Sequence, residues 1–136
     1  MRIRAAFLLG LCLAAGGAAA QNFTTAAEVR PVLGMTRANW VTLREYNGRD
    51  LIYFSHLLAW RCGLSEIRYG LNGAAAQQVL KMEPCHEGSA QPNALSGDGV
   101  FVAAPPGSVA SVRVRLIYDD GGSDEAAFDR ADILRR

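Results

Sequence analysis

The sequence predicts an all-β fold: an antiparallel β-sandwich of about six or seven strands, preceded by a short N-terminal helix. Two observations support this. Apolar and polar residues alternate with a period of two in several segments after residue 40, which is the pattern of strands that bury one face. Turn signals such as Asn47-Gly48 and Asn72-Gly73 punctuate these segments, and short strands with turns about every 8 to 12 residues are typical of sandwiches.

Residues 1–20 have the features of a cleavable secretory signal peptide. Two arginines lie within the first four residues, an uncharged apolar stretch covers residues 5–15, and three alanines precede Gln21, the expected mature N-terminus. An uncleaved membrane anchor is disfavoured because the apolar run is shorter than the roughly 20 residues that span a bilayer. A lipoprotein site at Cys12 is disfavoured because the bulky Leu11 precedes it.

Cleavage would leave 116 of the 136 residues, which we expect to form a helical segment (residues 21–39) and one sandwich domain (residues 40–136). The signal holds two of the 14 basic residues and none of the 13 acidic ones, so the remainder has a formal net charge of −1. A near-neutral chain without a Lys/Arg block gives no reason to expect nucleic acid or an anionic membrane as a partner. We expect a periplasmic or secreted protein with no membrane span after cleavage.

The helix is expected within residues 22–39. Thr25 and Glu28 have the spacing of a capping box. Apolar positions and one threonine then fall on one side: Val29, Val32, Leu33 and Thr36. Pro31 is tolerated only in a first helical turn, and Gly34 weakens the helix, so the prediction is a short helix.

The first hairpin is predicted around Asn47-Gly48, because both residues accept positive φ. Residues 40–46 form its first strand. Residues 50–60 form a long second strand, although the leucines in its second half leave a helix open as an alternative.

The second hairpin is predicted from residues 64–71 and 76–84. If residues 72–75 form its loop, Tyr69 pairs with Gln78, and the apolar residues of both strands share one face. A two-residue turn would keep the apolar residues on one face but would make Cys62 a diagonal neighbour of Cys85.

Cys62 and Cys85 are expected to form a disulfide. Cys12 leaves with the signal, and an even number of cysteines in an exported chain favours a disulfide over two free thiols. The predicted register independently places Cys62 opposite Cys85. Directly opposed antiparallel residues have Cα atoms about 4.5–5.5 Å apart, which lies within the disulfide range of about 4.4–6.8 Å.

The remaining strands follow a loop at residues 87–99. A short strand is predicted at residues 100–103 and a strand with clean alternation at residues 109–118, in which Val112, Val114, Leu116 and Tyr118 point inward. Asp and Gly residues at positions 119–122 predict a hairpin turn, and residues 123–128 return. The last residues have helical spacing as an alternative to strand.

The order of these elements resembles that of immunoglobulin- or fibronectin-type domains over about residues 40–128, which implies an Ig-like sandwich. Cys62 and Cys85 are too close in sequence to be the inter-sheet bridge of antibody domains, and Trp60 precedes Cys62. The run Trp-Arg-Cys-Gly-Leu at residues 60–64 is also similar to small uncharacterised exported proteins of proteobacteria. Neither resemblance implies an activity.

His56 is interpreted as a half-buried structural residue on an apolar strand face, because a lone histidine lacks the further ligands that zinc needs. A catalytic base or metal ligand is the alternative. Ser55 is expected on the opposite face, so the two residues cannot pair as in a serine hydrolase.

Three further motifs carry little chemistry. In Cys85-His86-Glu87 the cysteine is expected in a disulfide, and Gly97-Asp98-Gly99 is too short for a phosphate loop. Four carboxylates at residues 119–125 do not match EF-hand spacing and are equally explained as turn residues. The sequence therefore predicts no catalytic residue, no metal site and no cofactor.

Arginines and aromatic residues are the most suggestive set. Arg68, Arg113 and Arg115 occupy outward positions on strands that are adjacent in the usual sandwich order, and such residues concentrate in binding hot spots. The alternative is an ordinary charged sheet face interleaved with Glu66 and Glu83. The candidate binding residues are Arg68, Arg113, Arg115, Tyr53, Trp60 and His56, with Arg44, Tyr46, Arg49 and Arg61 nearby in the same pattern.

The function expected from these patterns is that of a small, exported, non-catalytic binding module of the cell envelope. Its partner would be an envelope protein, a peptide or a glycan. The alternative is a structural accessory subunit of an envelope complex, and a small hydrolase with an unrecognised site is the least favoured class.

Overall fold

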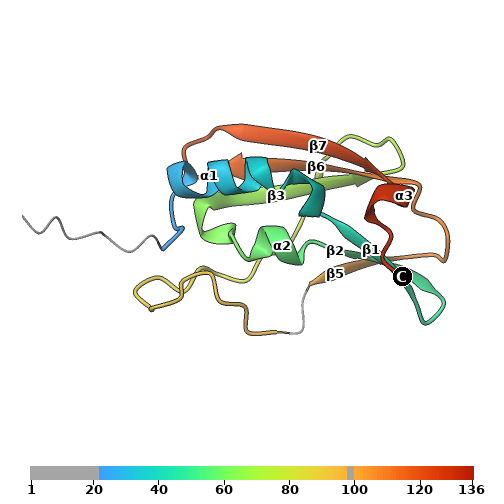
Figure 1. The fold of residues 1–136 in the computed structure, drawn as a ribbon, viewed down its shortest axis with the longest axis horizontal. Coiled ribbons are helices and arrows are strands. Elements are labelled where there is room, and N and C mark those ends of the chain that lie inside the picture. Colours follow the sequence, from blue (N-terminus) through green and yellow to red (C-terminus); the bar gives the residue numbers. More distant parts are fainter. Residues whose placement is uncertain (1–21, 98–99) are drawn as a thin grey trace, which may run out of the picture.

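The structure is a computed structural model that describes residues 22–97 and 100–136; the predicted signal peptide at residues 1–20 lies outside the described residues. The chain forms two antiparallel sheets, a three-stranded sheet of order β1-β2-β5 and a four-stranded sheet of order β4-β3-β6-β7 (Figure 1). Seven strands in two sheets confirm the predicted all-β sandwich for the described part of the chain.

The three-stranded sheet is built on the predicted Asn47-Gly48 hairpin. Its strands are β1 (Thr42–Tyr46), β2 (Arg49–Tyr53) and β5 (Phe101–Ala104). Asn47 and Gly48 both adopt positive φ, 53° and 71°, as a two-residue turn requires. β1 begins later than predicted because Trp40 ends a short 3₁₀ helix, η1 (Arg37–Asn39), and is fully buried.

The four-stranded sheet contains the second predicted hairpin. Its strands are β3 (Leu64–Leu71), β4 (Gln78–Val79), β6 (Ser111–Tyr118) and β7 (Ser123–Asp129). Tyr69 pairs with Gln78 in the predicted register, although β4 is only two residues long. The same register brings Cys62 and Cys85 together with a Cα–Cα distance of 5.3 Å, and the predicted disulfide is confirmed.

The prediction of one long strand over residues 50–60 is wrong. β2 ends at Tyr53 and is followed by α2 (Ser55–Leu58) and the 3₁₀ helix η2 (Arg61–Gly63). Leu57 and Leu58 are both buried in the core. A strand would send these neighbours to opposite faces, whereas a helical turn beside the sheet buries both.

The N-terminal helix, α1 (Ala26–Met35), forms with the predicted cap. The backbone N–H of Glu28 donates to Thr25 Oγ1 at 3.3 Å. The helix continues through Pro31, beyond the predicted first turn, because the buried side chains of Val29 and Leu33 anchor it on both sides of the proline. The predicted alternative of a C-terminal helical turn corresponds to α3 (Arg130–Ile133).

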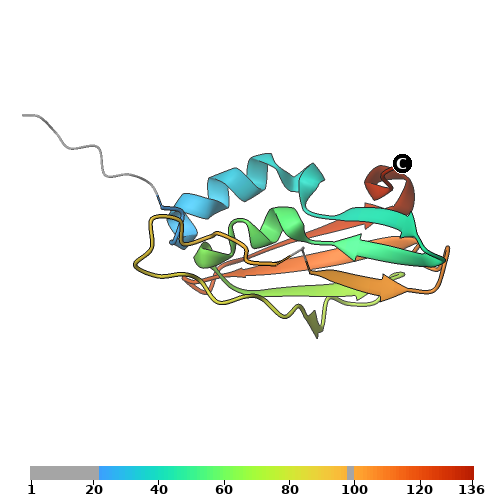
Figure 2. The same cartoon turned by 90° about the horizontal axis from the view of Figure 1, so that it is seen from below.

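The core lies between the four-stranded sheet and a mixed layer. α1 and α2 lie beside β1 and β2 and cover the same face of the four-stranded sheet (Figure 2). The largest fully buried side chains of this core are Trp40, Tyr118 and Phe54. Within residues 22–97 and 100–136, no helix packs on the outer face of either sheet.

Candidate functional site

The six predicted binding residues do not lie on one surface. Arg68, Arg113 and Arg115 lie on the outer face of the four-stranded sheet, where Arg68 and Arg115 are direct cross-strand neighbours. Tyr53 lies on the three-stranded sheet, on the opposite side of the sandwich. His56 and Trp60 lie in or after α2. The set therefore divides into three separate places.

The arginines of the four-stranded sheet are largely paired with carboxylates on the same face. Arg68 Nε lies 2.8 Å from a Glu66 oxygen, and Arg113 Nη1 lies 3.2 Å from a Glu125 oxygen. These pairs are half-exposed, and such ion pairs contribute little binding energy or stability. We call this surface, formed by Glu66, Arg68, Arg113, Arg115 and Glu125, the charge-paired face.

His56 lies on helix α2 and not on a strand, which corrects its predicted placement. Its Nε2 lies 2.8 Å from Thr36 Oγ1. The Thr36 hydroxyl donates its only proton to the carbonyl of Val32 at 2.7 Å, so Nε2 carries the imidazole proton. Burial lowers the pKa of His56. The residue ties α2 to the end of α1, and no hydrogen bond joins it to Ser55 among the described residues.

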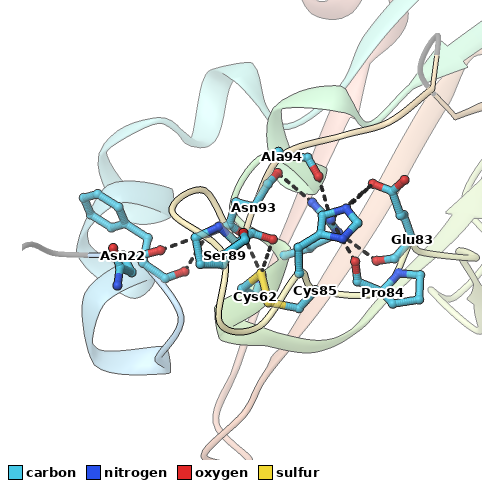
Figure 3. The surroundings of a disulfide bond; sticks show 12 residues. Asn22, Cys62, Glu83, Pro84, Cys85, Ser89, Asn93 and Ala94 are labelled. Atoms are coloured by element: carbon cyan, nitrogen blue, oxygen red, sulfur yellow. Dashed lines mark hydrogen bonds and ion pairs between the residues drawn. A yellow bond between two sulfur atoms is a disulfide. The ribbon is translucent and has the colours of Figure 1, made fainter.

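Trp60 packs at the start of the described chain. Its ring meets Phe23 edge to face with centroids 4.8 Å apart. Asn93 holds the same segment, because its side-chain NH₂ donates to the carbonyl of Phe23 at 2.9 Å and to that of Asn22 at 3.3 Å. The Asn93 carbonyl oxygen accepts from the backbone N–H of Cys62 at 2.8 Å (Figure 3). Trp60 is thus partly buried and packs against the first described residues.

Arg61 is a buried structural residue. In the sequence it belongs to the same pattern as the surface arginines, which does not reveal its burial. Its side chain is about 1% exposed. Its guanidinium donates to a set of carbonyl oxygens from one helix end and one loop: those of Leu58, Glu83, Pro84, Asn93 and Ala94. It also contacts the Glu83 carboxylate at 3.2 Å. Together with the Cys62–Cys85 disulfide, Arg61 fixes residues 83–94 (Figure 3).

Three of the four carboxylates of the last hairpin, those of Asp120, Asp124 and Glu125, are engaged by another side chain. Asp120 accepts two hydrogen bonds of 2.8 Å from Arg30, and Asp124 accepts one of 2.6 Å from the Tyr118 hydroxyl. Among the described residues, no three His, Cys, Asp or Glu side chains are grouped as a metal site would require. These acids therefore brace the sheet ends.

The outer face of the three-stranded sheet is the strongest candidate site. Strand alternation places five large side chains on it, and we call them the aromatic–arginine face: Arg44, Tyr46, Arg49, Tyr53 and Phe101. Tyr46 is 55% exposed and Phe101 is 43% exposed. The Arg44 guanidinium lies 4.6 Å from the centre of the Tyr46 ring, and the rings of Tyr53 and Phe101 lie 5.7 Å apart.

Among the described residues, strand alternation places two arginines and no carboxylate on this face. Within the described ranges, the acids nearest to it, Glu45 and Asp50, alternate to the other side of the sheet, where both bind Arg130. Leu51, between Arg44 and Ala103, is only 3% exposed, so the surrounding side chains close over the centre. At one end a hollow of about 350 Å³ is lined by Tyr46 and Arg49 together with Glu45, Gly48 and Gly107, so the Glu45 carboxylate borders this end of the face.

The residues of this face could be found only in part from the sequence. The Asn47-Gly48 hairpin pairs Tyr46 with Arg49 and thereby places both on one side of the sheet. The pairing of Phe101 with Tyr53 joins strands about fifty residues apart and has no local sequence signal.

No protein-family model matches the chain, and comparison with curated proteins and with solved structures also finds no match. Among the described residues, no helix combines the length and apolar character needed to cross a membrane. Inference about function therefore depends on the geometry of the aromatic–arginine face.

Proposed function

We propose that the chain is a small, exported, non-catalytic binding module of the cell envelope, and that the aromatic–arginine face is its binding surface. One observation carries the proposal. Two exposed arginines and three aromatic rings share a face without a carboxylate among the described residues, whereas the arginines of the opposite face are mostly paired. Tyr and Arg are the residues that dominate binding hot spots, and a macromolecular partner can bind such a flat surface.

We further propose that the sandwich is Ig-like. If its strands are lettered A to G in chain order, the sheets read A-B-E and D-C-F-G. Immunoglobulin constant domains have A-B-E-D and C-F-G, so the two orders differ only in the fourth strand. The disulfide differs as well, since Cys62 precedes β3 and Cys85 follows β4. The strand order supports the proposal, and the disulfide marks a departure from antibody domains.

Export is supported by two independent features. Residues 1–20 have the pattern of a signal peptide, and the Cys62–Cys85 disulfide fits an oxidising compartment such as the periplasm or the cell exterior. The partner in that compartment would be an envelope protein, a peptide or a glycan.

Site-specific photo-crosslinking in intact cells tests the proposed surface. A photoreactive amino acid replaces Tyr46 on the aromatic–arginine face or, as a matched control, Arg115 on the charge-paired face. We expect a discrete crosslinked product from position 46 and none from position 115, with the partner identified by mass spectrometry. Crosslinks only from position 115 would contradict the proposed surface. A stoichiometric complex that survives purification would instead indicate an accessory subunit.

A further inference from the structure

The two edges of the three-stranded sheet differ. At the β1 edge, Leu134 forms a parallel bridge with Leu43, and the N–H of Arg135 donates to the carbonyl of Leu43 at 2.8 Å. At the other edge, β5 pairs only with β2 among the described residues. The C-terminal segment therefore covers part of one edge, and the β5 edge is open.

The turn geometry shows which groups of β5 face this open edge. In a two-residue hairpin the pair next to the turn, here Tyr46 and Arg49, is hydrogen-bonded, and such pairs alternate along the strands. The backbone hydrogen bonds between β2 and β5 are therefore formed, on β2, by the N–H and C=O groups of Asp50 and Ile52. Their partners are Ala104 and Val102. The N–H and C=O groups of Phe101 and Ala103 consequently point away from the sheet.

The β5 edge carries neither charge nor bulge, and its protection is limited to its length of four residues and to Pro105 and Pro106, which follow it. Natural edges carry charges, prolines or bulges that prevent pairing with another chain. Residues 100–104 are Val-Phe-Val-Ala-Ala, and the β2–β5 register is continuous without a bulge. Val100 is also partly exposed beside Phe101. An open, uncharged edge of this kind is a template for strand addition by a peptide.

The charge beside this edge indicates the chemistry of the peptide. An added strand would lie two strand spacings from β2, or about 10 Å from the backbone of Arg49. An arginine and a glutamate side chain can together cross that distance, and Arg49 lies one position past the Asp50–Ala104 pair, beside the end of β5. No described carboxylate on this face competes for Arg49 or Arg44. The occupant that fits is therefore extended and acidic.

A second copy of the chain fits less well. Self-pairing through the four residues of β5 would give a short contact, whereas stable interfaces bury about 1,200 Å² or more. It would also join two positively charged faces into one continuous sheet.

We propose that the β5 edge binds an extended acidic peptide segment by strand addition. The main-chain groups of Phe101 and Ala103 pair with the peptide, and Arg49 binds one of its carboxylates. This inference rests on the proposed binding function and names its mode and ligand class.

The test uses twelve-residue peptides selected from a random displayed library against the purified, disulfide-linked protein. We expect selected peptides to alternate acidic and β-branched residues. Ala103→Pro removes an outward N–H but no β2–β5 bond, and should weaken their binding at least tenfold, whereas Ala103→Ser should not. Arg49→Glu should weaken binding similarly, and Arg115→Glu on the opposite face should leave it unchanged.

Two further measurements keep the test decisive if Ala103→Pro does not fold. In one measurement, the peptide is N-methylated at every second residue, in two versions that together cover all positions. The version that blocks the N–H groups facing β5 should lose binding, and the other version should keep it. Amide exchange of Phe101 and Ala103 should slow when peptide binds.

Strand addition is overturned if no acidic peptide is selected, or if binding is indifferent to both Ala103→Pro and N-methylation. It is also overturned by a dimer that Ala103→Pro abolishes in the absence of peptide. Polygalacturonate serves as an acidic glycan probe. If it binds, and if Arg49→Glu abolishes this binding whereas Ala103→Pro does not, strand addition is overturned. The aromatic–arginine face would then remain a binding surface. If position 46 gives no crosslinked product in intact cells, the proposed binding function itself is contradicted.

Discussion

The two ends of the sandwich are held by different chemistry. At the end that carries α1 and α2, Arg61 donates to main-chain carbonyls and contacts the Glu83 carboxylate beside a disulfide. At the hairpin end, Asp50 on β2 is fully buried and accepts from the N–H groups of Gly107 and Val109 and from Arg130. The comparison teaches that reductant should act at the first end, and that loss of the Asp50 charge should act at the second.

Loss of Arg61 should have the largest effect. Arg61→Ala leaves several buried carbonyls and the Glu83 carboxylate without their donor, so we expect the free energy of unfolding to fall by about 4 kcal/mol. Urea denaturation measures the change. Arg115→Ala, an exposed arginine, should change it by less than about 0.5 kcal/mol. A loss below about 1 kcal/mol for Arg61→Ala would show that Arg61 does not stabilise this end.

Loss of the disulfide should rank second. It links residues separated by 23 positions, and the chain-entropy model gives such a loop about 3 kcal/mol. The double variant Cys62→Ala, Cys85→Ala should therefore melt at a lower temperature, and the unaltered protein should match it in strong reductant. An unchanged melting midpoint in reductant would contradict this role. No loss of chemistry is expected, because the sulfurs act as a structural link.

Neutralisation of Asp50 should rank third and weaken the hairpin end alone. The hydrogen bond from Arg130 lowers the pKa of Asp50 to about 2 against the cost of burial, with further contributions from the Val109 and Gly107 N–H groups. Asp50→Asn should thus cost about 2 kcal/mol at pH 7. Asp132→Asn, at an exposed carboxylate of α3, is the matched control. Equal effects of the two substitutions would refute a special role for Asp50.

Acid should produce the smallest effect, again at the hairpin end. Because the folded-state pKa of Asp50 lies below its ordinary value of 3.8, its ionised form stabilises the fold above that value, and this stabilisation is lost as pH falls toward 2. The loss from Asp50 should be about 1 kcal/mol between pH 5 and pH 3. Urea midpoints at these pH values, compared with those of Asp50→Asn, isolate it. Parallel pH profiles for the two proteins would argue against the assignment.

The fold was predictable where neighbouring segments pair. The Asn47-Gly48 turn and the Tyr69–Gln78 register follow from local alternation, and the cysteine positions independently agreed with the second. The switch from β2 to α2 could be given only as an alternative to a long strand, because a short apolar run is compatible with both periods. Burial of Leu57 and Leu58 against the core decides for the helix.

The candidate site was less predictable than the fold. Arg61 has no local sequence mark that distinguishes a buried arginine from the exposed Arg44, because its burial depends on loop carbonyls more than twenty residues away. The aromatic–arginine face likewise depends on β5 joining β2 and on the four-stranded sheet covering the inner side of the three-stranded sheet. Both features arise from contacts between distant segments, which one sequence does not specify.

The hydrogen bonds of Asn93 have a consequence for biogenesis. Its side chain binds the carbonyls of Asn22 and Phe23 on one side and the N–H of Cys62 on the other. Residues 22 and 23 are therefore held beside the backbone of a disulfide cysteine. Oxidation of the Cys62 and Cys85 thiols and docking of residues 22 and 23 should consequently be coupled, because both place partners of the same Asn93 side chain.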